Sequence, residues 1–114
     1  MTESAQNFEM VQGNDLDVAI VVRDEAGVVR DLTGATVKFA MATERAATPV
    51  LTKTTPTEIV LSDPLNGEFT VKFKVADTTG LEEGVYVFEA ETTDSSGNVV
   101  AVTLGRILLY KSII

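Results

Sequence analysis

The side chains in this sequence that could do chemistry are carboxylates, and most of them lie in segments rich in turn-forming residues. Calcium takes about six to eight oxygen ligands, which neighbouring loops could share. However, aspartates in turns usually accept hydrogen bonds from local backbone, and the spacing is not that of an EF-hand. We favour the turn-forming role and keep calcium as the alternative for Asp15, Asp17, Asp24, Glu25, Asp31 and Asp94.

Two closer pairs of carboxylates are Glu82-Glu83 and Glu89-x-Glu91. Residues two apart on a strand project from one face, but a catalytic dyad also needs a cleft, so a solvated face is favoured. The chain has no histidine and no cysteine, which excludes Ser-His and Cys-His nucleophile pairs and disulfides. We therefore expect no catalytic residue, cofactor or metal, and an enzyme is the least favoured class.

The chain is acidic, with 17 Asp and Glu against 9 Lys and Arg and a net charge of -8. Nucleic-acid binding depends on clustered basic residues, so no nucleic-acid partner is expected. Residues 1–6 are polar and are expected to be flexible, and the apolar runs are too short to span a membrane. We expect synthesis in the cytoplasm without export and no membrane association.

Hydrophobic residues recur with a period of two along most of the chain, which predicts strands with one buried face. Roughly seven to nine short strands at intervals of about ten residues are typical of a β-sandwich. We predict one all-β, antiparallel domain spanning residues 1–114, with one helical turn between residues 76 and 83. The predicted strands cover residues 8–12, 16–23, 37–41, 50–54, 59–61, 69–75, 84–93 and 98–110.

Glycines mark the predicted corners, at Gly27, Gly34 and Gly97. Gly84 begins the penultimate predicted strand, and Tyr86 follows it two residues later. Immunoglobulin-like folds place a tyrosine at this point, where its hydroxyl bonds upstream backbone in a tyrosine corner. The alternative is an ordinary half-buried tyrosine. These residues predict an immunoglobulin-like sandwich in which all five have structural roles.

A long apolar tract covers residues 99–110, with Arg106 as its only charge. One interpretation is a central strand buried on both faces, with a bulge at Gly105. The other is that residues 107–114 extend past the sandwich and contact a partner chain, by edge addition or as an oligomer seam. The candidate interface residues are Ile107, Leu109, Tyr110, Ile113 and Ile114.

Several turn motifs carry a resemblance to a known family, and together they span most of the chain. They are Gln12-Gly13-Asn14, Asp31-Leu32-Thr33-Gly34-Ala35, Gly67-Glu68-Phe69 and Leu81-x-x-Gly84-x-Tyr86. In these motifs the sequence resembles the amino-terminal immunoglobulin-like domain of tailed-bacteriophage baseplate upper proteins and related phage structural proteins. The resemblance does not distinguish a baseplate, tail or head location.

The resemblance implies a non-enzymatic structural protein of a phage or prophage particle, made in the bacterial cytoplasm and located in the virion. Its partners would be other copies of itself, as a homo-oligomer, and neighbouring phage structural proteins. The alternative is an adhesion module whose loops bind carbohydrate or a host-surface protein.

Overall fold

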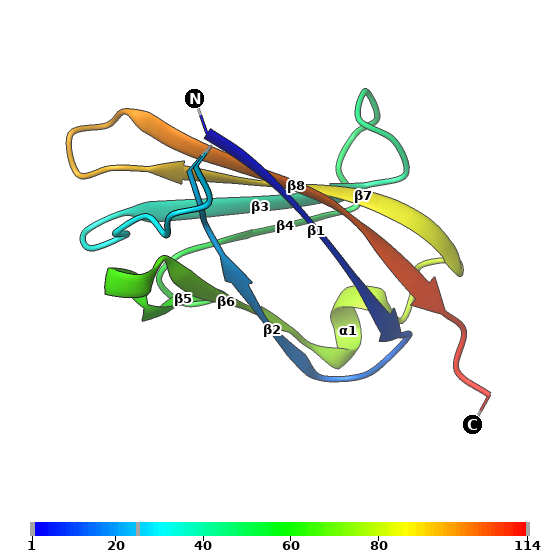
Figure 1. The fold of residues 1–114 in the computed structure, drawn as a ribbon. Helices are drawn as coiled ribbons and strands as arrows, with labels where there is room; N and C mark the ends of the chain where they lie inside the picture. Colours follow the sequence, from blue (N-terminus) through cyan, green and yellow to red (C-terminus); the bar gives the residue numbers. More distant parts are fainter. Residues whose placement is uncertain (1, 25, 114) are drawn as a thin grey trace.

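The chain folds into two packed β-sheets that Figure 1 shows edge-on. The computed structural model describes residues 2–24 and 26–113, with the backbone alone for residues 2–6. A single helical turn, α1, closes one end of the space between the sheets (Figure 1). The elements are β1 (Thr2–Val11), β2 (Leu16–Val21), β3 (Thr36–Ala42), β4 (Leu51–Thr54), β5 (Ile59–Asp63), the 3₁₀ turn η1 (Pro64–Asn66), β6 (Glu68–Phe73), α1 (Val75–Thr78), β7 (Gly84–Thr93) and β8 (Val99–Tyr110).

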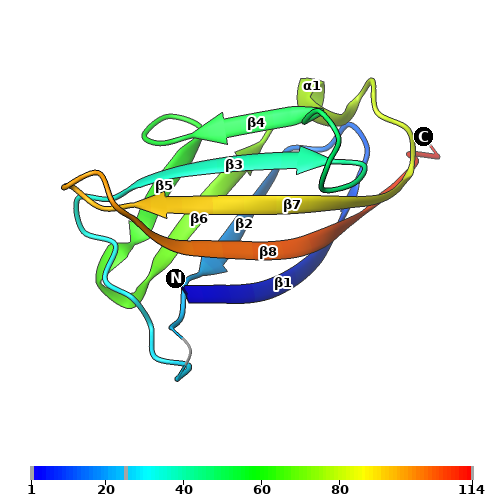
Figure 2. The ribbon, with the colours of Figure 1, turned by 90° about the horizontal axis from the view of Figure 1, so that it is seen from above.

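The strand order confirms the predicted immunoglobulin-like sandwich. One sheet has five strands in the order β1-β8-β7-β3-β4, and the other has three in the order β2-β6-β5. In immunoglobulin-like folds the second, fifth and fourth strands of the sandwich share one sheet, and the third and the last two share the other. Strands β2, β6 and β5 occupy the first set of positions, β3, β7 and β8 occupy the second, and β4 adds a strand beyond β3 (Figure 2).

The first strand corrects one prediction. It runs parallel to β8, from Thr2 opposite Ala101 to Val11 opposite Tyr110, so the sandwich is not wholly antiparallel. The ladder includes the backbone of residues 2–6, part of the segment that we predicted to be flexible. The parallel pairing follows from the path of the chain, because β2 crosses to the other sheet and leaves β1 beside the last strand.

The predicted alternation does fill the core between the sheets. Ile20, Phe69 and Val71 of the three-stranded sheet are completely buried against residues of the five-stranded sheet. An aromatic cluster lies at the centre: the ring of Phe39 stacks on Phe88 at 5.3 Å and meets Phe73 edge-on at 5.6 Å. Phe88 stands two residues after Tyr86, where antibody domains have the second cysteine of their disulfide. Aromatic packing occupies that place in this chain, which has no cysteine.

Strand β6 ends at Phe73, two residues earlier than predicted. Val75 is 51% exposed and is the first residue of α1, so it does not continue the inward row. Two carboxylates hold the backbone at this point: Asp77 Oδ2 accepts a hydrogen bond from the Lys74 N–H at 2.7 Å, and Asp15 Oδ1 accepts one from the Val75 N–H at 3.0 Å. The helical turn expected between residues 76 and 83 is confirmed, since α1 spans Val75–Thr78.

Strand β8 lies between β1 and β7, so its predicted central position is confirmed. The prediction that it is buried on both faces is wrong, because Arg106 and Tyr110 are exposed on its outer face. Gly105 pairs with Phe88 in unbroken register, and the shift in register falls between Thr92 and Thr93. The predicted bulge at Gly105 is therefore wrong. Ile107 is 0% and Leu109 is 1% exposed. Both face the core, so their assignment to a partner interface is wrong as well.

Gly67 is the position where the backbone approaches most closely across the fold. Its φ is +75°, and a Cβ added there would lie 2.7 Å from the carbonyl oxygens of both Arg30 and Val22. The Val22 N–H donates to the Gly67 carbonyl at 2.8 Å, and the Arg30 N–H donates to the Val22 carbonyl at 2.9 Å. Only glycine fits this junction between β6 and the segment after β2.

Candidate functional site

The outer face of the five-stranded sheet carries apolar side chains on two long neighbouring strands, β7 and β8. Because alternate residues of β7 and β8 fill the core, the intervening residues must lie on the outside. Val85 is 57% exposed, and its cross-strand partner Leu108 is half-buried, as are Val87 and Leu104. We call Val85, Val87, Leu104 and Leu108 the apolar strip.

Charged side chains border the apolar strip. Glu89 lies opposite Leu104, and Arg106 lies opposite Val87. Further along the same face, Lys38 of β3 pairs with Glu91 of β7, which places opposite charges on neighbouring strands. Apolar residues surrounded by a polar border are the arrangement found at protein contact surfaces.

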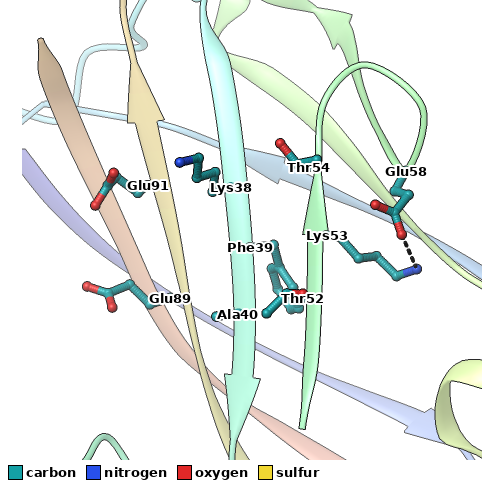
Figure 3. A pocket seen from close by; sticks show the side chains of 9 residues that line it. All are labelled: Lys38, Phe39, Ala40, Thr52, Lys53, Thr54, Glu58, Glu89 and Glu91. Carbon is teal, nitrogen blue, oxygen red and sulfur yellow. Dashed lines mark ion pairs between the residues drawn. The ribbon is translucent and has the colours of Figure 1, made fainter. Parts of the chain in front are cut away.

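Two hollows open on or beside this face. One, of about 320 Å³, lies over the apolar strip and is lined by Asn7, Phe8, Glu9, Val85, Arg106 and Leu108. The other, of about 420 Å³, lies around β3 and β4 and is shown in Figure 3. Its lining residues are Lys38, Phe39, Ala40, Thr52, Lys53, Thr54, Glu58, Glu89 and Glu91.

The remaining predicted interface residues lie at the end of β8. Tyr110 is 43% exposed and extends the outer face beyond the apolar strip, next to Val11 of β1, which is 38% exposed. Ile113 is 99% exposed and follows the strand. Ile114 lies outside the described residues. Of the predicted set, Tyr110 is therefore the residue that the structure brings onto the same face as the apolar strip.

Asp24, Asp31 and Asp94 accept hydrogen bonds from the backbone of their own turns, as the turn-forming interpretation predicts, whereas Asp15 accepts one from the distant Val75 N–H. Asp24 Oδ1 accepts the Ala26 and Val28 N–H groups, and Asp94 Oδ1 accepts those of Ser96 and Asn98. The hydrogen bonds from the Asn98 backbone hold the pKa of Asp94 below its ordinary value.

The carboxylate of Asp31 is held in the same way, by the hydroxyl and the backbone N–H of Thr33. The Thr33 hydroxyl is the larger cause of its lowered pKa. Asp17 lies on the outer face of the three-stranded sheet opposite Lys72, and Glu25 lies outside the described residues. Within residues 2–24 and 26–113, no three acidic side chains form a group that could hold a metal ion.

Tyr86 makes the contact expected of a tyrosine corner. Its hydroxyl donates to the carbonyl oxygen of Glu82 at 2.6 Å, and its side chain is 5% exposed. Burial raises the pKa of the phenol above its ordinary value, which keeps the hydroxyl protonated as a donor. The bond ties the start of β7 to the loop that precedes it.

The three glycines predicted at corners have positive φ, with 82° at Gly27, 77° at Gly34 and 90° at Gly97, and Gly84 at the start of β7 has a φ of 147°.

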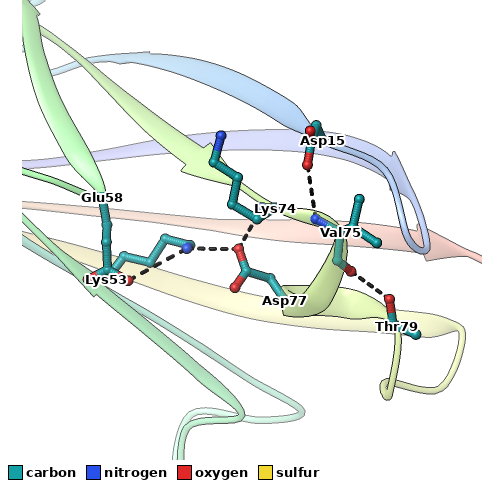
Figure 4. A network of polar contacts seen from close by, with 7 residues as sticks. All are labelled: Asp15, Lys53, Glu58, Lys74, Val75, Asp77 and Thr79. Carbon is teal, nitrogen blue, oxygen red and sulfur yellow. Dashed lines mark hydrogen bonds and ion pairs between the residues drawn. The ribbon is translucent and has the colours of Figure 1, made fainter.

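Sequence reasoning missed Lys53, a buried cation on the inner side of β4. Its side chain is 4% exposed, and its Nζ lies 2.8 Å from Asp77 Oδ2 and 3.8 Å from Glu58 Oε2 (Figure 4). The sequence did contain an indication of this burial. Lys53 lies two residues after Leu51, which packs against the core, and residues two apart on a strand point to the same side. An inward-pointing charge on an end strand also disfavours pairing with another chain at that edge.

No protein-family model fits this chain, and no curated protein is significantly similar to it in sequence. Among the described residues, no helix has the length and apolar character needed to cross a membrane. The fold class therefore rests on strand order and core packing.

Proposed function

We propose that this chain is a non-enzymatic assembly protein that contacts other polypeptides through the outer face of its five-stranded sheet. The observation that supports the proposal most strongly is the apolar strip with its charged border. Val85 is 57% exposed and Tyr110 is 43% exposed on one side of one sheet. Removing such side chains from water on association would release about 25 cal/mol for each Å² of apolar area buried.

The resemblance in the turn motifs suggests the kind of particle in which this chain would act. Tyr86 with its bond to Glu82, Gly84 at the start of β7 and the corner at Gly34 all occupy corners of the immunoglobulin-like sandwich. We propose a structural component of a tailed-phage or prophage particle, located in the virion. Its partners are further copies of itself, as a homo-oligomer, and neighbouring structural proteins of the head, tail or baseplate.

The second candidate function is adhesion, in which the loops at one end of the sandwich bind carbohydrate or a host-surface protein. Three aspartates of these loops, Asp24, Asp31 and Asp94, have carboxylates that accept hydrogen bonds from local backbone. Carboxylates already committed in this way are less available to a ligand. We therefore rank recognition by these loops below assembly through the apolar strip.

Light scattering of the purified full chain, combined with a glycan array, separates the two functions. Assembly predicts a defined molar mass that is a multiple of the chain mass and no glycan binding. A strict monomer at all concentrations that binds carbohydrate would contradict assembly and favour adhesion. Genes for head, tail or baseplate proteins beside its own gene are the expected genetic context for a particle protein.

A further inference from the structure

Two exposed charges, Arg106 on β8 and Glu89 on β7, lie diagonally from each other on the outer face of the five-stranded sheet, where the two strands run side by side (Figure 2). Arg106 lies opposite Val87 in the strand ladder. Glu89 lies opposite Leu104 in the next pair on this face, so the charges occupy one diagonal of a rectangle and the apolar residues the other. Among the side chains that the structure describes, every ion pair involves Lys53, which leaves both of these charges available to a second polypeptide.

This rectangle is complementary to a second copy of itself. A two-fold axis that runs parallel to the sheet, along the apolar diagonal, exchanges the two ends of the charged diagonal. In a face-to-face dimer with this axis, Arg106 of each copy meets Glu89 of the other, and the two apolar corners each meet the same residue of the other copy. Because the diagonal is oblique to the strands, the strands of the two copies cross at roughly a right angle, which is one of the two usual modes of packing between sheets.

The same axis places Leu108 over a hollow in the other copy. The outward-facing residues of β8 run from Leu104 to Leu108. A second row starts at Leu104 and crosses the sheet through Glu89 to Ala40 and Thr52. The axis lays the first row of one copy along the second row of the other, so Leu108 falls on Ala40 and Thr52, which line the hollow of about 420 Å³ in Figure 3. Each copy thus receives a leucine over a small side chain, which removes apolar surface from water.

A second pair of opposite charges meets at the margin of this dimer. Glu9 of β1 is exposed and lies opposite Leu108, and the exposed Lys38 is the outward-facing neighbour of Ala40 on β3. The axis that lays Leu108 on Ala40 also brings Glu9 to Lys38 of the other copy. Both kinds of charge contact therefore join opposite signs, although each chain has a net charge of -8. Complementary charges fix the register of an interface, whereas like charges in contact disfavour it.

We propose that two copies of this chain pair face to face about the diagonal from Val87 to Leu104, so that Arg106 of each copy binds Glu89 of the other. This inference rests on the proposed function, because it names the partner that the apolar strip contacts, a second copy of the chain. A two-fold contact uses the same surface on both copies and closes on itself, so the expected unit is a dimer and not an open chain of copies.

Charge reversal tests the pairing, with the molar mass of full chains measured by light scattering. Arg106→Glu places two carboxylates at each charge contact of the central pair, and Glu89→Arg places two cations there. Each variant alone should therefore have the mass of one chain at a concentration where the wild type has the mass of two. An equimolar mixture of the two variants again sets one arginine against one glutamate at both contacts, so it should recover the mass of two chains. Circular dichroism shows that each variant is folded.

The matched control is Lys72→Glu, which makes the same reversal of charge on the outer face of the three-stranded sheet, opposite Asp17. This variant should keep the mass of two chains. A mixture that stays at the mass of one chain, single variants that keep the wild-type mass, or a wild type of three chains would overturn the pairing and leave the proposed function in place. A wild type with the mass of one chain at all concentrations would overturn both.

Discussion

The two sheets of this sandwich share one core but present different surfaces to solvent. On the three-stranded sheet, the Thr70 hydroxyl donates to Ser62 Oγ at 2.9 Å, and the Ser62 hydroxyl donates to Glu68 Oε1 at 2.8 Å. On the five-stranded sheet the corresponding surface is the apolar strip. The first surface has a network of hydrogen-bonded hydroxyl and carboxylate groups, whereas the second has a row of neighbouring apolar side chains in contact with water.

The difference indicates which surface is suited to a partner. Burying the three-stranded face would remove water from a network of hydroxyl and carboxylate groups, which is costly unless each finds a new hydrogen bond. Burying the apolar strip removes hydrocarbon from water and leaves Glu89 and Arg106 at the border, where they can set orientation. We therefore expect substitutions on the outer face of the five-stranded sheet to weaken association, and substitutions at buried positions of either sheet to change the stability of the fold.

The largest effect on folding is expected where the three-stranded sheet joins the rest of the fold. Gly67→Ala places a Cβ 2.7 Å from two backbone carbonyls at a positive φ. We expect it to lower the free energy of unfolding by about 3 kcal/mol, measured by urea denaturation. The matched control is Gly97→Ala, which has a φ of +90° but no atom within 4 Å of the added Cβ, so its cost should be about 1 kcal/mol. Equal losses in the two variants would contradict the close approach at Gly67.

A hydroxyl on the inner side of the five-stranded sheet is expected to destabilise the wild type. Thr92 is 0% exposed, and its Oγ1 has no hydrogen-bond partner among the described residues. Thr92→Val keeps the shape and should raise the free energy of unfolding by about 1 kcal/mol in urea denaturation. Thr52→Val at an exposed position of β4 is the control and should change it by less than about 0.5 kcal/mol. A loss of stability in Thr92→Val would show that the hydroxyl has a partner.

The hydrogen bond of the tyrosine corner should contribute about as much to the free energy of unfolding as the Thr92→Val substitution changes it. Tyr86→Phe removes the donor to the Glu82 carbonyl and leaves the ring in place. We expect the free energy of unfolding to fall by about 1 kcal/mol, with no change in the secondary structure measured by circular dichroism. Unchanged stability would mean that Tyr86 acts through its packing alone.

The smallest effect is expected from pH at the exposed loops. The pKa of Asp94 is lowered in the folded chain by hydrogen bonds from backbone N–H groups, foremost that of Asn98. A lowered pKa in the folded state gives stability that is present above the ordinary value of 3.8 and is lost as the pH falls through the folded pKa. The melting temperature should therefore fall slightly more steeply in acid for the wild type than for Asp94→Asn. Parallel curves would contradict this.

The alternation of apolar and polar residues predicted the strands well, because each residue of a strand is apolar or polar according to whether it faces the core or the solvent. Ile20, Phe39 and Phe73 all face the core as the period of two requires. The parallel pairing of β1 with β8 could not be predicted in this way, because it joins residues 99 positions apart and depends on the order of strands in the sheet. No local pattern of residues specifies a partner at that distance.

The errors in the predicted interface have the same origin. Residues 107–110 are four consecutive apolar residues, so alternation cannot show whether the odd-numbered or the even-numbered pair faces the core. The pairing of Ile107 with Tyr86 of β7 settles it, and Leu108 takes the outer position. Lys53 was missed for a related reason, because a charged residue on a short strand is ordinarily read as solvent-facing.

The most direct test of the contact surface is the molar mass of two matched variants measured by light scattering. Leu108→Lys places a charge in the apolar strip, and Val60→Lys places the same charge on the outer face of the three-stranded sheet, where Val60 is 37% exposed. We predict that the wild type and Val60→Lys have the same oligomeric mass and that Leu108→Lys, still folded by circular dichroism, has the mass of one chain. A monomeric wild type, or an oligomer lost in Val60→Lys but retained in Leu108→Lys, would contradict the assignment.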